Sequence, residues 1–342
     1  MLHQSICVSR RCSKARKGQN AVKRHGHLFE RITDIDNLKE AHRNARKGKT
    51  KYREVQFVDE NEETCLHQIQ QMLLTETYQV SEYEVFARKE NGKERILSKL
   101  PYYPDRIIQW AILLVIGPLF EKKLITDTYS SIKGRGMHLA VQRVQAYLKK
   151  QTRTQYCLKM DVRKYYQSID KAILKQMLGK MFKDQRLLHL LAQIVDSYEA
   201  GIPIGNYLSQ YLANIYLDGL DRRIKEVHKI KGYYRYMDDL VIIHKNKKFL
   251  HHISKDVIWY CEKYLNLSIK KNYQVFPVEK RWIDFVGYVI RKNGIRLRKG
   301  IKSRMRLKLK KKQYGCIPSY NGWLKWCNCN TLKQKYLFEV IT

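Results

Sequence analysis

The sequence lacks the long apolar segments of a membrane-spanning or secreted protein. Its longest apolar run, at residues 111–120, is about half of the roughly 20 residues that a spanning helix needs. The first 17 residues contain no continuous apolar stretch of the kind found in a secretory signal. Eight cysteines in 342 residues are too few for a disulfide scaffold. We therefore expect reduced thiols and a cytoplasmic protein without membrane contact.

Acidic residues are also scarce. The chain has 32 Asp and Glu residues against 67 Lys and Arg, a formal net charge of +35 and a pI near 9.8. Such an excess repels itself unless a polyanion neutralises it. Nucleic acid is therefore the leading partner, and acidic membranes or proteins are a minor alternative. Residues 1–27 contain no acid, and we expect them to form a disordered basic tail that can hold phosphates.

The apolar pattern predicts an α+β protein with an antiparallel sheet. The hydrophobic content of 44% is ample for a core. Apolar residues three or four apart predict helices at 28–38, 66–73, 105–120, 139–148, 171–199, 208–223 and 249–265. Short β-rich runs predict strands at 155–162, 274–278 and 284–290, and hairpins at 83–97 and 232–243. Asn91-Gly92 is the expected turn of the first hairpin.

Two acidic centres lie in this basic and apolar background. Asp161 ends a predicted buried strand, and Asp238 and Asp239 occupy the tip of the second hairpin. An ordinary turn favours Asp, but adjacent carboxylates repel each other and the flanking strands are apolar. A pair of divalent ions would offset that repulsion and could serve phosphoryl transfer. Oxygen ligands without His or Cys favour Mg²⁺, with Mn²⁺ as a substitute, over zinc.

These centres lie within motifs of a known family. Residues 236–239 (YMDD) resemble the YxDD box of reverse transcriptases. Residues 161–166 (DVRKYY), 77 positions before Asp238, resemble their first catalytic strand, an aspartate followed by aromatics. Residues 92–96 and 105–109 resemble the finger motifs of the same family. Residues 285–288 resemble its primer-grip hairpin. The resemblance extends from residue 28 to the C-terminus.

Finer features resemble one branch, the reverse transcriptases of diversity-generating retroelements, which are group II intron-like bacterial enzymes. The motifs are residues 202–210 (IPIGNYLSQ), 213–217 (ANIYL) and 319–326 (SYNGWLKW), the last similar to a thumb signature. Tyr207-Leu208 departs from the more common Leu-Thr. Enzymes of this branch copy a template RNA with frequent errors opposite adenine, and the cDNA replaces a variable region in a target gene.

The resemblance implies a right-hand polymerase, bacterial or phage-encoded. Fingers would comprise residues 28–125 and 171–200, the palm 126–170 and 201–290, and a basic thumb 291–342. Implied partners are template RNA, the RNA/DNA hybrid, deoxynucleoside triphosphates and an oligomeric accessory variability protein. Alternatives are a retron or short group II intron-like enzyme, or a catalytically dead RNA-binding scaffold. An RNA-dependent RNA polymerase is disfavoured, because an aromatic at Tyr166 should exclude ribonucleotides.

The resemblance also assigns roles to individual residues. Asp161, Asp238 and Asp239 would be catalytic and hold the metals, with the Val162 carbonyl as an extra ligand. Lys271 would be the general acid, and Lys270 is an equally placed rival. The remaining expected sites are nucleotide binding by Lys93, Arg95, Tyr166, Ile204 and Gln210; the primer grip of Phe285, Gly287 and Tyr288; and nucleic-acid contacts by Arg296, Arg298, Lys299, Lys302, Arg304 and Arg306.

Several of these residues have plainer interpretations. Tyr165 is expected in the core, Lys93 can belong to a solvated turn, and Ile204 can simply pack against the fingers. The tyrosines and arginine at 233–236 suit either stacking on bases or a buried strand. Cys316, Cys327 and Cys329 lack zinc-site spacing and are expected to be incidental thiols.

Overall fold

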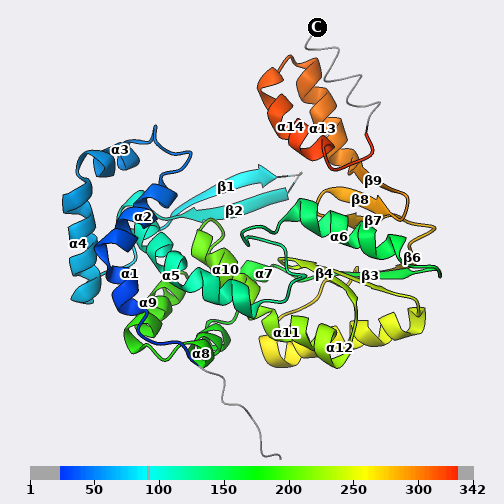
Figure 1. Ribbon diagram of the computed structural model, residues 1–342, viewed down its shortest axis with the longest axis horizontal. Coiled ribbons are helices and arrows are strands. Elements are labelled where there is room, and N and C mark those ends of the chain that lie inside the picture. The colour runs from blue at the N-terminus through cyan, green and yellow to red at the C-terminus, as the bar shows by residue number, and fades with distance from the viewer. Residues whose placement is uncertain (1–23, 91–92, 330–342) are drawn as a thin grey trace, which may run out of the picture.

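The structure is a computed structural model that describes residues 24–90 and 93–329 (Figure 1). Most of the predicted basic tail, the Asn91-Gly92 turn and the last 13 residues lie outside the described residues. No helix in the described part of the chain has the length and apolarity that crossing a bilayer requires.

A helical lobe is built around one buried helix, α5 (Ile107–Lys123), which is apolar on nearly every face. Because α5 is apolar around most of its surface, other helices cover it, and α1 (Phe29–Thr33), α2 (Ile35–Ala45) and α10 (Tyr207–Tyr216) pack against it most closely. The rest of the lobe, on the left of Figure 1, consists of α3 (Arg53–Glu60), α4 (Glu62–Leu74), α8 (Lys171–Met181) and α9 (Gln185–Asp196). The predicted hairpin of β1 (Glu84–Glu90) and β2 (Lys93–Lys99) extends from this lobe toward the rest of the molecule.

Two sequence predictions about this lobe need correction. The helix expected over 171–199 is interrupted after Met181, because Asp184 caps α9 through the Leu187 N–H and also accepts the N–H of Leu28. The basic tail was expected to continue to residue 27. Instead, His25 forms a parallel β-bridge with Phe182, so residues before 28 take part in the fold.

The predicted antiparallel sheet is confirmed in the second lobe. Its strand order is β4-β5-β3-β6, formed by β3 (Tyr156–Asp161), β4 (Gly232–Tyr236), β5 (Asp239–His244) and β6 (Gln274–Pro277). Because side chains alternate, one face carries Leu158 and Ile242 into the main core, which includes α12 (Lys247–Leu265). The other face carries Cys157 and Val241 into a second core with α6 (Met137–Lys149). Figure 1 shows α6 on one side of the sheet and α12 on the other.

A smaller sheet and two helices follow the main sheet. The sheet consists of β7 (Ile283–Phe285), β8 (Tyr288–Arg291) and β9 (Gly294–Leu297), and the helices are α13 (Lys299–Lys310) and α14 (Ile317–Leu324). The single strand expected at 284–290 is instead a hairpin, because Val286 and Gly287 turn the chain with positive φ angles of 43° and 87°. The short helices α7 (Tyr165–Ser168) and α11 (Asp218–Arg222) complete the fold.

Candidate active site

The sheet register brings the three predicted aspartates to one end of the palm strands. Asp161 on β3 lies directly opposite Asp239 on β5, so the two side chains share a face of the sheet. Asp238 lies in the β4–β5 turn, where the backbone N–H of Val162 donates to its carbonyl at 3.4 Å. Met237 opens this turn with a φ of +54°, a left-handed conformation that is uncommon for a non-glycine residue.

The electrostatics of this cluster call for a cation. Burial, and then the neighbouring Asp161 carboxylate, raise the pKa of Asp238. Burial raises the pKa of Asp239 to about 6, against the lowering effect of Lys159. One oxygen of Asp239, Oδ1, is buried and has no hydrogen-bond partner among the described residues. The fold thus places carboxylates where their ionisation is costly, and it leaves one carboxylate oxygen without a hydrogen bond.

Two lysines partly offset this negative charge. The Lys159 Nζ lies 3.5 Å from Asp239 Oδ2, and the Lys270 Nζ contacts Asp161 Oδ1. The backbone N–H of Lys270 also donates to the Asp161 carbonyl at 2.9 Å, whereas Lys271 is exposed. The structure therefore places Lys270, the rival of the predicted general acid, against the Asp161 carboxylate. Lys159 was not singled out in the sequence, because its partner belongs to another strand.

The cluster fits a divalent metal by charge and donor chemistry. Among the described residues, no three His, Cys, Asp or Glu side chains converge as they would around a bound ion. The aspartates nevertheless offer hard oxygen ligands, a raised pKa at two carboxylates and the unused Asp239 Oδ1, which together suit Mg²⁺ or Mn²⁺. Asp161, Asp238 and Asp239 are thus the residues that would hold such an ion.

A buried ion pair beneath the β4–β5 turn was missed at the sequence level. Arg235, fully buried, donates through Nε and Nη2 to Asp221 at 2.8 and 2.6 Å. Its Nη1 donates to the Met237 carbonyl at 3.0 Å, next to Asp238. Although burial opposes charge, the Asp221 carboxylate raises the pKa of the Arg235 guanidinium. Arg235 therefore connects the β4–β5 turn to Asp221 of α11 through hydrogen bonds.

The same strand decides the alternative left open for residues 233–236. Tyr233 and Tyr234 are buried, and the Tyr233 hydroxyl donates to Asp221 at 2.6 Å. Base stacking by these two tyrosines is therefore excluded, and they are core residues. Tyr165 is likewise buried, as expected, with its hydroxyl donating to the Ala213 carbonyl.

The loop at 201–205 joins the predicted nucleotide-binding residues. The Ser98 N–H of β2 donates to the Ile204 carbonyl at 2.8 Å, and the Ile202 N–H donates to the Tyr166 carbonyl at 2.9 Å. Gly201 has a φ of +67°, and a Cβ there would lie 2.1 Å from the Tyr166 carbonyl oxygen. Only glycine allows the loop to approach the Tyr166 backbone so closely. The loop thereby connects Tyr166 with β2 of the β1–β2 hairpin, which we call the fingers hairpin.

Tyr166 and Arg95 lie close to the carboxylates. The half-buried Tyr166 hydroxyl donates to the Met237 Sδ at 3.6 Å. Burial and then Asp161 raise the pKa of Asp238, and the charge of Arg95 on β2 lowers it. Gln210 accepts from the Ser131 hydroxyl at 2.5 Å. The Lys93 side chain lies outside the described residues.

The primer-grip residues point inward. Phe285 and Tyr288 are fully buried, and the Tyr288 hydroxyl donates to the Trp323 carbonyl at 3.0 Å. Gly287 was expected to admit a primer backbone. Its space is taken instead by the side chains of Trp323 and Ile301, 2.7 and 2.8 Å from a Cβ built there. A primer contact in this hairpin remains a prediction and would have to use the backbone.

The predicted nucleic-acid-binding cations lie on or just before α13. This helix buries Ile301, Met305 and Leu309 along one face and leaves Arg304 and Arg306 exposed on opposite flanks of that face. Lys299 is also exposed, and Lys302 is half-buried. Arg296 lies over the Trp282 ring at 4.7 Å, and Arg298 is paired with Asp284. Arg298 would therefore have to share or break its ion pair with Asp284 to bind a phosphate.

The fold defines a right-hand polymerase, with the predicted catalytic aspartates at one end of an antiparallel palm sheet and a β-hairpin, β1–β2, in the neighbouring helical lobe. The family model for "Reverse transcriptase (RNA-dependent DNA polymerase)" matches residues 87–290, which include both aspartate motifs. The chain therefore belongs to the reverse transcriptase family.

Individual relatives are distant. Protein YkfC of Escherichia coli (strain K12) is 27% identical over 154 residues, 42% of this chain and 40% of that protein. The group II intron-encoded protein LtrA of Lactococcus lactis subsp. cremoris is 22% identical over 153 residues, 42% of this chain and 25% of that protein. The matches thus cover less than half of either relative. A solved apo telomerase from Candida tropicalis is 14% identical, with a TM-score of 0.49 over 64% of this chain and 49% of that chain.

Proposed function

We propose that this protein is an RNA-directed DNA polymerase that makes cDNA on an RNA template. The observation that carries the proposal is the register that sets Asp161 opposite Asp239 and beside Asp238 in a chain of the reverse transcriptase family. A non-catalytic RNA-binding scaffold is disfavoured, because buried, mutually repelling carboxylates would weaken its binding of a polyanion.

In the proposed reaction, Asp161, Asp238 and Asp239 hold divalent cations, with the Val162 carbonyl as a further ligand. Bound Mg²⁺ supplies activation of the attacking 3′ oxygen and neutralisation of charge on the transferred phosphate. Lys159 and Lys270 hold the carboxylates in place until the ion binds. A proton-donating role toward pyrophosphate falls to Lys270 or Lys271, and the contact of Lys270 with Asp161 supports the former.

The incoming deoxynucleotide is assigned to the space between the fingers hairpin and the palm. Arg95 and Lys93 bind the triphosphate there through their positive charges. The Arg95 guanidinium stays protonated at any working pH. Tyr166 lies against the sugar, where a ribose 2′-hydroxyl would clash. Gln210 and Ile204 line the same region. The charge of Arg95 lowers the pKa of Asp238, and the Asp238 carboxylate raises the pKa of Tyr166, which supports this assignment.

We further propose that the enzyme belongs to the diversity-generating branch and works with an oligomeric accessory protein. Residues 202–210 and 319–326 support this branch over a retron or a short group II intron-like enzyme. The neighbouring DNA provides the test. A template repeat and a nearly identical variable repeat that differ at adenines are expected, and their absence would favour the alternatives.

The branch assignment predicts a role for Ile204 in fidelity. Ile204→Gln is expected to lower misincorporation opposite adenine several-fold, because glutamine adds a hydrogen bond worth about 0.5–1.5 kcal/mol to correct geometry. The measurement is sequencing of cDNA made by both proteins on one adenine-containing template. If errors opposite adenine were unchanged while extension stayed normal, Ile204 would have only a packing role.

The basic face of α13 predicts salt-sensitive RNA binding. Contacts of its cations with six or more phosphates should weaken affinity about a thousandfold between roughly 50 and 200 mM salt, through counterion release. A titration of labelled template RNA at several salt concentrations measures this slope. An affinity that barely changed over the same range would remove the electrostatic basis of the proposed contact.

A further inference from the structure

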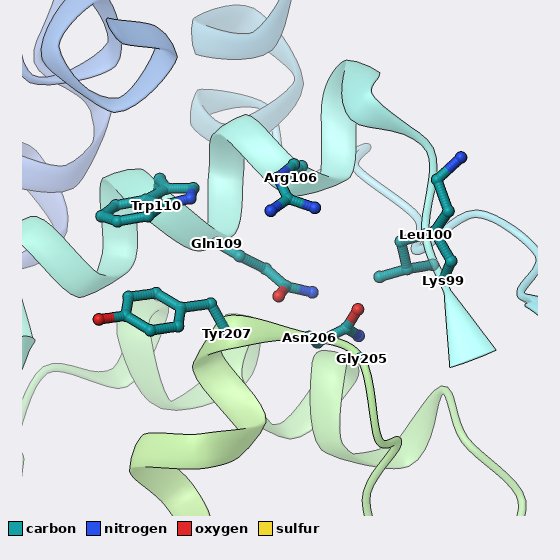
Figure 2. Close-up of a pocket in the computed structure, with 8 residues that line it drawn as sticks. All are labelled: Lys99, Leu100, Arg106, Gln109, Trp110, Gly205, Asn206 and Tyr207. Carbon is teal, nitrogen blue, oxygen red and sulfur yellow. The ribbon is translucent and has the colours of Figure 1, made fainter. Parts of the chain in front are cut away.

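A small cavity, which we call the donor pocket, lies where β2, the start of α5 and the start of α10 meet (Figure 2). Figure 2 shows the side chains of Arg106 and Gln109 on one side and Asn206 on the other, around a common space. Trp110 and Tyr207 form one wall, with their rings stacked 4.8 Å apart. The cavity encloses about 20 Å³, which is room for a single oxygen atom.

Every unsatisfied buried polar atom of this pocket is a hydrogen-bond donor. Three of these atoms, Arg106 Nε, Gln109 Nε2 and Trp110 Nε1, have no acceptor among the described residues. The fourth, Asn206 Nδ2, makes no hydrogen bond of normal geometry, and its amide interacts with the Tyr83 hydroxyl. The burial is deep, since Gln109 is 4% exposed and Asn206 is 7% exposed. Buried donors in folded proteins almost always have a partner, so an acceptor has to come from outside the protein.

The pocket is also positively charged. Arg106 is half-buried and has no carboxylate partner in the described part of the chain, and burial lowers the pKa of its guanidinium. Lys99 lines the same pocket, although its Nζ also forms ion pairs with the carboxylates of Glu54 at 3.8 Å and Glu84 at 3.5 Å. In the adjoining groove of about 300 Å³, the pKa of Lys49 is lowered by burial and then by Arg106 and Lys99.

The start of α10 adds to this positive potential. Asn206 stands at the N-cap position without a side-chain capping hydrogen bond, so the first N–H groups of the helix carry uncompensated partial charge. A water molecule would supply an oxygen for the cavity but no negative charge for Arg106. An anionic oxygen supplies both.

We propose that the donor pocket binds a phosphate oxygen of the nucleic-acid backbone, with the remainder of the strand in the groove beside Lys49. The inference rests on the proposed polymerase function and adds one subsite to it. The competing source of the same chemistry is the triphosphate of a nucleotide. The backbone is favoured because the pocket adjoins this larger groove, where Tyr52 and Phe86 offer rings to bases and three cations, Lys49, Lys99 and Arg106, outnumber Glu54 and Glu84.

The test is Gln109→Glu, which places a carboxylate beside Arg106 without changing the shape of the side chain. The new ion pair should leave the melting temperature equal or higher, while affinity for an RNA–DNA hybrid falls about tenfold or more through lost donation and added repulsion. The slope of log affinity against log salt should also decrease by about one. Gln71→Glu, on an exposed position of α4, makes the same charge change as the control.

Asn206→Asp provides an independent variant, because aspartate is a good N-cap residue and preserves folding. It should also weaken hybrid binding. If neither variant changed hybrid affinity while both proteins stayed folded, the pocket would hold only a water and the proposal would be overturned. A raised KM for deoxynucleotide with unchanged hybrid affinity would assign the pocket to the triphosphate and also overturn it. The wild-type protein tests the function separately, since failure of wild-type extension would contradict the polymerase and not the pocket.

Discussion

Replacing Asp238 by asparagine is expected to lower primer extension by about two to four orders of magnitude. The substitution removes one ligand charge from the carboxylate cluster, and metal stabilisation of the transition state is worth several kcal/mol. The fold should not suffer, because burial and Asp161 already disfavour the ionised form of Asp238. RNA affinity should be retained, because the basic surface is unchanged.

The measurement is extension of a primer on template RNA, with RNA binding and thermal stability followed in the same preparation. Asp36→Asn serves as the control, since Asp36 has an 88% exposed side chain on α2 and the same charge is lost. Asp161→Asn should match Asp238→Asn. Undiminished extension by the Asp238→Asn protein would refute the catalytic assignment.

The second large effect is expected on stability. Arg235→Met should lower the free energy of unfolding by about 3–5 kcal/mol, because the buried Asp221 carboxylate is left without its cation. The Met237 carbonyl also loses its donor. Extension activity should therefore fall even at temperatures where the variant is folded.

Urea denaturation of Arg235→Met, Asp221→Asn and the double variant gives the coupling between the two residues. The double variant should be more stable than the sum of the single losses predicts, because no buried charge remains. Arg43→Met is the matched control, since its side chain is 66% exposed and surface ion pairs contribute about 0–1 kcal/mol. A wild-type denaturation midpoint for Arg235→Met would show that the pair does not stabilise the fold.

The parts of the fold that were predicted correctly depend on local signals. The fingers hairpin, β3, the β4–β5 hairpin and α12 all follow from short-range periodicity and turn residues. The break between α8 and α9 was not predicted, because it depends on Asp184 contacting Leu28, 156 residues away in the chain. At β7–β8 the apolar pattern indicated one strand, because no standard turn pair marks Val286-Gly287, and only the family resemblance of residues 285–288 indicated a hairpin.

The candidate site also combines residues that the sequence predicts with contacts that it does not predict. Asp161, Asp238 and Asp239 could be found from the sequence, because metal-dependent phosphoryl transfer needs carboxylates and acids are rare in this basic chain. Residue type and spacing carry that chemistry. They carry no information on which lysine approaches which carboxylate, on the partner of Arg235, or on whether Tyr288 faces a primer or the core. Those outcomes were decided by strand register and by packing between distant segments, since burial and ion pairing depend on neighbours in space and not on neighbours in the chain.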